Sequence, residues 1–90
     1  MKAATADYAR HGIRVNAVAP GVVRTPSTEQ FFASGPQFDA LVVRSTPLGR
    51  AGSDTEIAEA AAWLLSDRAS YVAGVTLPVD GGITATRWFD

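Results

Sequence analysis

The feature that most constrains the fold is a short apolar run at residues 13–19, bounded by Gly12 and by Pro20-Gly21. Its apolar residues fall on both alternating faces, as in a strand of a parallel sheet that is buried on both sides. An alanine-rich, helix-forming segment at residues 2–11 precedes the run, and Gly12 suits the left-handed turn that commonly ends a helix. This helix–glycine–strand order predicts an α/β fold.

The second half of the chain predicts one helix and one further strand. Ser53 and Glu56 have the spacing of a capping box, which begins a helix over residues 54–65. Apolar residues then recur on one face of that helix, namely Ile57, Ala60, Ala61, Leu64 and Leu65. Residues 75–80 predict a strand parallel to the first. Because Pro78 cannot donate to a sheet ladder, this strand should lie at a sheet edge.

Between the two strands, the sequence is less regular. Residues 26–46 predict one or two short helices, interrupted where Ser34-Gly35-Pro36 breaks the apolar pattern. Residues 47–52 predict a loop.

Composition excludes several classes of function. The net charge of −1 provides neither a basic surface for nucleic acid nor a polybasic membrane patch. There is no cysteine, and His11 is the only histidine, which argues against a metal site. The 47% hydrophobic and 19% charged residues predict a globular chain. No apolar run has the length of a signal peptide core or a membrane span, so we expect a cytoplasmic protein.

Three segments together, residues 12–25, 47–58 and 66–82, resemble the C-terminal portion of classical short-chain dehydrogenase/reductases in order and spacing. The resemblance implies that residues 1–90 are the C-terminal part of one Rossmann-type, doubly wound parallel sheet. The chain would supply its last two strands with their flanking helices. Residues 26–46 would then be the helices of the family's substrate loop.

The same resemblance implies a cofactor site after the first strand, where ligands of open α/β sheets bind. NAD or NADP would contact Pro20, Gly21, Val22 and Thr25. Backbone groups of Val22 and the Thr25 hydroxyl would orient the nicotinamide carboxamide. The alternative is that Pro20-Gly21 is only a turn, and that Thr25 only caps a helix beginning at Pro26.

Two aromatic groups have both a functional and a structural interpretation. Phe31 and Phe32, with Phe38, would form a flap over a small alcohol or carbonyl substrate, or would simply pack two helices together. Trp88 and Phe89 would anchor a partner chain, or would fold back locally.

Polar residues outside this loop are expected to have structural roles. Asn16 is expected to be a satisfied core amide. Arg14 and Arg24 are expected to be surface or ion-pair residues, and His11 to place charge at a helix end.

The residues that perform the family's chemistry are not found in this sequence, so no catalytic residue is assigned. Lys2 is the only lysine, and neither Tyr8 nor Tyr71 has a lysine four residues further on. A Gly-x-Gly-x-x-Gly loop is also missing. One interpretation is a piece of an NAD(P)-dependent oxidoreductase, from a truncated or mis-started reading frame, that is inactive alone and binds cofactor weakly or not at all. The other is a non-catalytic interaction module, which would pair with a partner or its own copy as a homo-oligomer.

Overall fold

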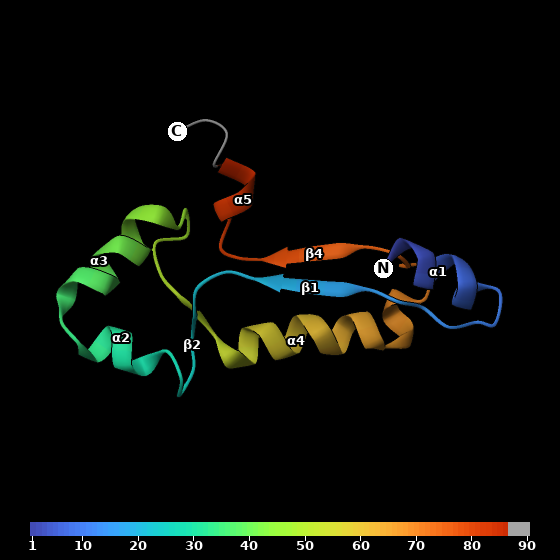
Figure 1. Ribbon diagram of the computed structural model, residues 1–90, viewed down its shortest axis with the longest axis horizontal. Coiled ribbons are helices and arrows are strands. Elements are labelled where there is room, and N and C mark those ends of the chain that lie inside the picture. Colours follow the sequence, from blue (N-terminus) through green and yellow to red (C-terminus); the bar gives the residue numbers. More distant parts are fainter. Residues whose placement is uncertain (87–90) are drawn as a thin grey trace.

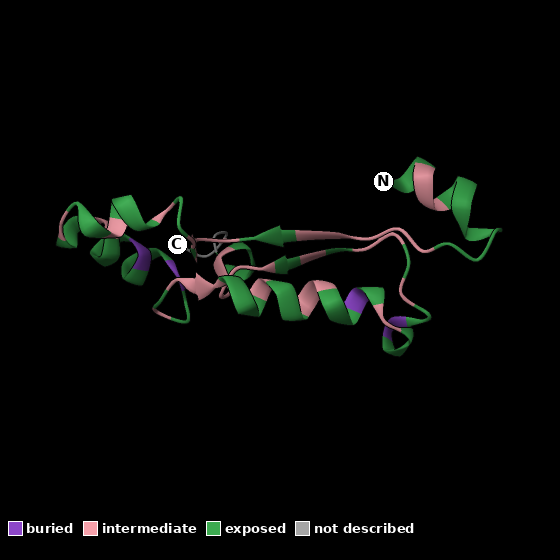
Figure 2. Cartoon of the chain, turned by 90° about the horizontal axis from the view of Figure 1, so that it is seen from below, coloured by how far each residue is buried: buried purple, intermediate pink, exposed green. Residues whose placement is uncertain are grey.

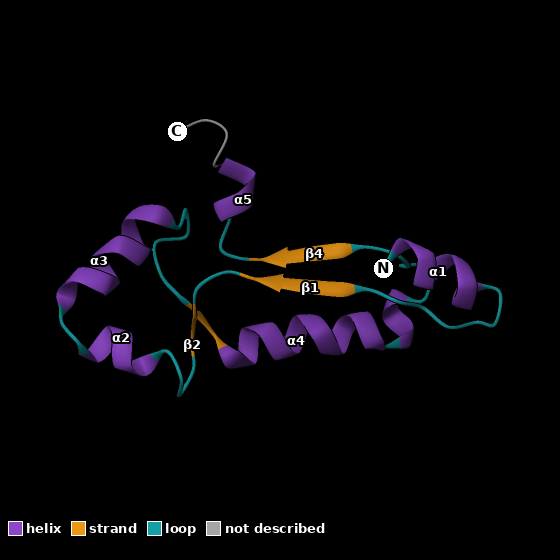
Figure 3. Ribbon diagram, in the orientation of Figure 1, coloured by secondary structure: helices purple, strands orange, loops and turns teal. Residues whose placement is uncertain are grey.

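The computed structural model describes residues 1–86 and shows an elongated α/β arrangement (Figure 1). The elements in chain order are α1 (Lys2–Ala9), β1 (Ala17–Pro20), β2 (Val23–Arg24), α2 (Glu29–Ala33), α3 (Pro36–Ser45), β3 (Gly52–Ser53), α4 (Asp54–Leu65), the 3-10 turn η1 (Asp67–Ala69), β4 (Thr76–Val79) and α5 (Ile83–Thr86). Figure 3 distinguishes helices, strands and loops by colour. Trp88 and Phe89, proposed above as an anchor, lie outside the described residues.

The two predicted strands pair in parallel, as the sequence indicates. Ala17 lies opposite Thr76, and Pro20 lies opposite Val79. The Gly21 amide donates to the Val79 carbonyl at 3.1 Å, so the odd-numbered residues of β4 direct their backbone groups toward β1. Pro78 therefore faces the other edge of the sheet, where its missing N–H breaks no ladder bond.

The first strand is shorter than the predicted residues 13–19, and Pro20 lies inside it rather than after it. Before Ala17, the Asn16 Oδ1 atom accepts the Val75 amide hydrogen at 3.0 Å, so a side chain replaces part of the backbone ladder. Pro20 is tolerated because alternate residues of β1 point away from β4. Its absent donor is not needed by the pair.

The prediction that the first strand is buried on both faces is wrong for this chain. Val18 is half-buried, whereas Ala19 and Pro20 are exposed. Helix α4 runs along one side of the β1–β4 pair, and no element among residues 1–86 covers the pair in the same way on the opposite side (Figure 2). Residues 13–19 have the composition of a strand that is buried on both faces, but among the described residues only α4 covers the pair, on one face.

A second parallel pair was not predicted. Val23 lies opposite Gly52, and Arg24 lies opposite Ser53. The Gly52 amide also donates to the Val22 carbonyl at 2.9 Å. Gly52, the last residue of the predicted loop at residues 47–52, is therefore part of β3. A strand of two residues is too short to show an alternating pattern of apolar residues in the sequence.

The capping box of α4 is confirmed, and it sets the start of the helix. The Glu56 amide donates to the Ser53 hydroxyl at 3.1 Å, while the Ser53 amide donates to the Glu56 carboxylate at 2.9 Å. Leu64 is buried at 5% exposure, but Leu65 is 84% exposed and does not belong to the predicted apolar face. The apolar face of α4 therefore consists of Ile57, Ala60, Ala61 and Leu64.

The N-terminal helix is also shorter than residues 2–11, because it ends at Ala9. Gly12 has a φ of +75°, which confirms the predicted left-handed turn. The buried apolar residues among those described are Val42, Leu64 and Ala69, so the core is small. No helix in residues 1–86 is long and apolar enough to cross a membrane.

We predict that the purified 90-residue chain self-associates. Among residues 1–86, no strand pairs with the second edge of β1 and no element covers the second face of the β1–β4 pair. A two-stranded sheet is also marginal in water. Size-exclusion chromatography with light scattering should therefore show oligomers or aggregate. A monodisperse 9.5 kDa species with well-dispersed amide NMR signals would contradict this.

We predict that Glu56 stabilises the fold at neutral pH and that this effect disappears in acid. Hydrogen bonds from Arg50 and from the Ser53 amide lower the pKa of Glu56 from 4.5 to about 2. Because the carboxyl pKa is lowered in the folded state, the stabilisation is complete above pH 4.5 and is lost as the pH falls toward 2. Glu56→Gln should therefore lower the Tm near neutral pH, and the difference from the unaltered chain should vanish in acid. Glu59→Gln, on the same helix, is the control, and an unchanging difference for Glu56→Gln would disprove the linkage.

Candidate functional site

The segment predicted to hold the cofactor, residues 20–25, follows the carboxyl end of β1. Since β1 and β4 are parallel, the residues that follow β4 lie at the same edge. A Cβ atom on Gly21 would lie 2.8 Å from both Cα and Cβ of Asp80. Gly21 therefore has a packing role between the two strand ends that does not depend on any ligand.

Of the Val22 backbone groups that are predicted to contact the cofactor, the carbonyl already accepts a hydrogen bond within the chain. The Val22 carbonyl oxygen accepts the Gly52 amide hydrogen at 2.9 Å, which attaches the segment to β3. A carbonyl oxygen has two lone pairs, so a second donor can still be accommodated.

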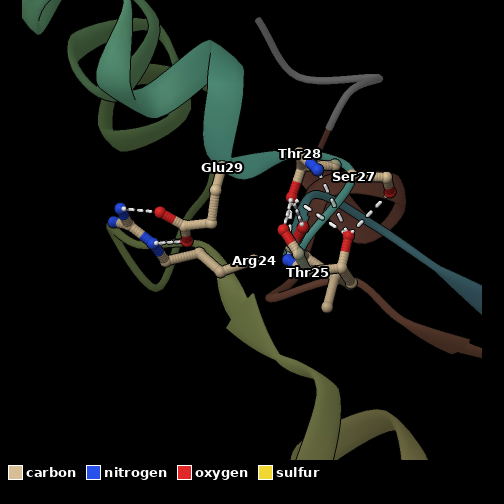
Figure 4. A network of polar contacts seen from close by, with 6 residues as sticks. Arg24, Thr25, Ser27, Thr28 and Glu29 are labelled. Carbon is tan, nitrogen blue, oxygen red and sulfur yellow. Dashed lines mark hydrogen bonds and ion pairs between the residues drawn. The ribbon is translucent and has the colours of Figure 1, made fainter.

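Thr25 lies in a compact turn closed by hydroxyl groups (Figure 4). Its Oγ1 atom is 3.0 Å from the Ser27 hydroxyl and 3.3 Å from the Thr28 hydroxyl. The Thr28 hydroxyl donates to the Val23 carbonyl at 2.7 Å and accepts the Thr25 amide hydrogen at 2.8 Å. The predicted helix start at Pro26 is wrong, because α2 begins at Glu29 with Thr28 as its N-cap residue. A cofactor would share the Thr25 hydroxyl with this turn.

The predicted substrate residues lie in an aromatic cluster between α2 and α3. The Phe32 and Phe38 rings meet edge to face at 4.8 Å, and the Phe31 and Phe38 centroids are 5.6 Å apart. The helices are separated at Gly35, whose φ of +146° is a backbone conformation that residues other than glycine rarely adopt. Phe32 and Phe38 thus do pack the helices together, while 49% of Phe31 stays exposed.

Arg24 joins this cluster to β2. Its Nε atom lies 2.9 Å from the Glu29 carboxylate, which confirms the predicted ion pair, and its guanidinium carbon lies 4.0 Å from the centre of the Phe32 ring. The hydrogen bond from Arg24 lowers the pKa of Glu29.

A cavity of about 590 Å³ lies beside the predicted cofactor segment. Val22 lines it from the link between β1 and β2, Leu48 from the loop after α3, Ile57 from α4, and Asp80 from the turn after β4. This volume is within the usual range for small-molecule sites, and most of the named side chains are apolar. The cavity therefore has the size and the mainly apolar lining of a small-molecule site.

Asp80 was not singled out from the sequence, although the following Gly81-Gly82 is a typical turn signal. Its carboxylate accepts hydrogen bonds from the Thr84 hydroxyl at 2.8 Å, the Thr84 amide at 3.1 Å and the Gly82 amide at 3.0 Å. These bonds, led by the Thr84 hydroxyl, lower the pKa of Asp80. Asp80 therefore shapes the turn that borders the cavity.

Two polar side chains before β1 hold the segment that leads into β4. Asn16 donates to the Val72 carbonyl at 3.0 Å and accepts from Val75, which confirms the predicted satisfied amide. The prediction that Arg14 is a surface or ion-pair residue is wrong. It donates to the carbonyls of Val72 and Ser66, both at 3.1 Å. Within residues 1–86, no three side chains are grouped as metal ligands.

Parallel strands, a helical cover and a cavity at the carboxyl ends of the strands are the arrangement in which open α/β proteins bind their ligands. A family profile described as enoyl-(acyl carrier protein) reductase matches residues 1–84. The chain belongs to the short-chain dehydrogenase/reductase family and corresponds to its C-terminal portion.

Individual relatives support this assignment. An A-factor type gamma-butyrolactone 1'-reductase (1S-forming) from Streptomyces virginiae is 53% identical over 83 residues, which are 92% of this chain and 32% of that protein. The structure of a 4-hydroxyisoleucine dehydrogenase complexed with NADH is 32% identical with a TM-score of 0.87, over 93% of this chain and 34% of that one. A putative 2-deoxy-d-gluconate 3-dehydrogenase from Agrobacterium tumefaciens with bound NADP is 40% identical with a TM-score of 0.85, over the same shares. The sheet is therefore of the Rossmann type, and the chain spans about a third of the length of these relatives.

We predict that Thr25→Val weakens cofactor binding more than it lowers stability. The substitution is nearly isosteric but removes the hydroxyl, and a neutral hydrogen bond contributes about 1 kcal/mol, or roughly fivefold in affinity. The measurements are the cofactor KM and the Tm of the protein encoded by the full reading frame. That protein is residues 1–90 together with any residues that are encoded in frame before Met1. Ser27→Ala, which removes a neighbouring hydroxyl of the same turn, is the control. A lower Tm with unchanged kinetics would restrict Thr25 to closing the turn.

Proposed function

We propose that this chain forms the nicotinamide end and the substrate loop of an NAD(P)-dependent oxidoreductase. The reaction moves a hydride between the cofactor and the carbon of a small alcohol or carbonyl substrate. The observation that carries the proposal is the position of residues 20–25, at the carboxyl end of a parallel strand and beside a cavity of about 590 Å³. Relatives of the same family are described with NADH and with NADP bound.

The residues of this chain would bind and orient rather than transfer a proton. Backbone groups of Val22 and the Thr25 hydroxyl would hold the nicotinamide carboxamide and so orient the ring toward the substrate. Pro20 and Gly21 keep this segment against the end of β4. Helices α2 and α3 bring Phe31 and Phe32 over the substrate and exclude water from the reacting atoms.

Other tasks of the reaction need groups that residues 1–90 do not contain. A proton donor must reach the substrate oxygen directly, and no tyrosine of this sequence has the lysine partner that the family uses. The cofactor pyrophosphate needs a glycine loop at a helix N-terminus, which is also missing from this sequence.

The exposed apolar side chains favour a second candidate, a non-catalytic interaction or oligomerisation module. Tyr71 is 99% exposed, Leu65 is 84% exposed and Leu48 is 69% exposed. Such residues are suited to contact another chain. A second copy of this chain is the simplest partner, because the edge of β1 that has no paired strand within residues 1–86 can pair with β1 of the other copy.

We predict no dehydrogenase turnover by residues 1–90 alone, and turnover by a full reading frame that adds a glycine loop and a Tyr-x-x-x-Lys pair. The reason is that proton transfer and pyrophosphate binding need those groups. The measurement is steady-state oxidation of NADH and NADPH with a panel of carbonyl compounds. Sequencing the DNA before Met1 shows whether such a longer reading frame exists, and its product is then assayed beside residues 1–90. Turnover by the pure 90-residue chain, or none by a reading frame with both motifs, would disprove the proposal.

A further inference from the structure

One arginine connects the aromatic cluster of α2 and α3 to the segment that carries Thr25. Arg24 is the last residue of β2, and it immediately precedes Thr25. Its Nε and Nη2 atoms donate to the two oxygens of Glu29, at 2.9 Å and 3.3 Å. Its guanidinium face lies over the Phe32 ring at 4.0 Å. We call these contacts of Arg24 with Glu29 and Phe32 the Arg24 latch.

The latch uses two properties that only an arginine combines. Glu29 and Phe32 are three residues apart on α2, so their side chains lie on one face of the helix. The planar guanidinium places its edge on the carboxylate and its face on the ring, whereas a lysine ammonium provides a point charge without a flat face. Arg24 therefore restrains both the distance and the rotation of α2 relative to β2.

The restraint extends to the whole helix pair. Phe38 of α3 contacts both Phe31 and Phe32, so α2 and α3 meet through one aromatic cluster. At the other end of the latch, β2 is fixed to β3 by parallel pairing. Gly35 provides a glycine backbone conformation between the helices. The latch is thus a direct side-chain link from a paired strand to the cluster that carries Phe31.

The link is exposed and therefore weak. The Arg24 and Glu29 side chains retain 48% and 53% of their accessible surface, and ion pairs of this kind contribute little to stability. Loss of the latch should change the orientation of the helices without unfolding the chain.

We propose that Arg24 is a positioning residue, which holds α2 and α3 at the angle that presents Phe31 and Phe32 to the substrate. This rests on the proposed oxidoreductase function. It predicts a selective effect on substrate binding, because the cofactor segment is held separately by β3 and by the Thr28 hydroxyl.

The test compares Arg24→Gln, Arg24→Lys and Glu29→Gln with Arg68→Gln, an exposed arginine of η1, in the full reading frame. Relative to Arg68→Gln, Arg24→Gln should raise the substrate KM roughly three- to tenfold, with the cofactor KM, kcat and Tm unchanged. Arg24→Lys, which keeps the charge, and Glu29→Gln, which keeps the stacking, should give smaller increases.

Failure of the latch can be distinguished from failure of the proposed function. Equal substrate KM values for Arg24→Gln and Arg68→Gln, in a protein that turns over, would overturn the latch alone. A drop in Tm with parallel changes in every kinetic constant would make Arg24 a structural residue and would also overturn it. No turnover by the unaltered full reading frame would overturn the proposed function, and the latch as a device for positioning substrate would fall with it.

Discussion

Asn16 makes the contact on which the rest of the structure depends. Its amide donates to Val72 and accepts from Val75, so one side chain fixes the register of two segments that are more than fifty residues apart in sequence. Arg14 adds donors to Val72 and to Ser66 at the end of α4. Both side chains donate to the Val72 carbonyl, so they hold the same point of the chain before β4. The parallel pairing of β1 and β4 begins directly beyond these contacts.

That pairing determines where a site can form. Parallel strands end at the same edge, so the turn after β1 meets the turn after β4. The two turns approach closely, since a Cβ on Gly21 would lie 2.8 Å from Cα of Asp80. Gly81 is also tightly packed, because a Cβ there would lie 2.6 Å from Cγ2 of Thr46. The Leu48 amide donates to the Gly81 carbonyl at 3.1 Å, which also fixes the end of the α3 segment there. The cavity beside Val22 is the space that these tight contacts leave.

Different parts of the chain are held by contacts of different kinds. Backbone pairing and half-buried polar side chains hold the sheet, and a capping box with an Arg50–Glu56 pair fixes the start of α4. Helices α2 and α3 lie apart from the sheet in Figure 1, and their aromatic cluster is linked to β2 by an exposed ion pair and a stacked guanidinium. In the proposed enzyme, the segment after β1 would position the cofactor, and α2 and α3 would contact the substrate.

The sequence by itself determined the local features. Ser53 and Glu56 start a helix, Gly12 makes the left-handed turn that follows one, and Pro78 requires a free sheet edge, because each depends on one backbone group or one dihedral angle. The resemblance of three segments was likewise sufficient for the family. The tertiary structure decided the rest: the β2–β3 bridge, the Arg14 contacts, the exposure of Leu65 and the stacking of Arg24 on Phe32. These depend on which distant segments meet, and a side chain's spacing along the chain carries no information about partners that only folding brings within reach.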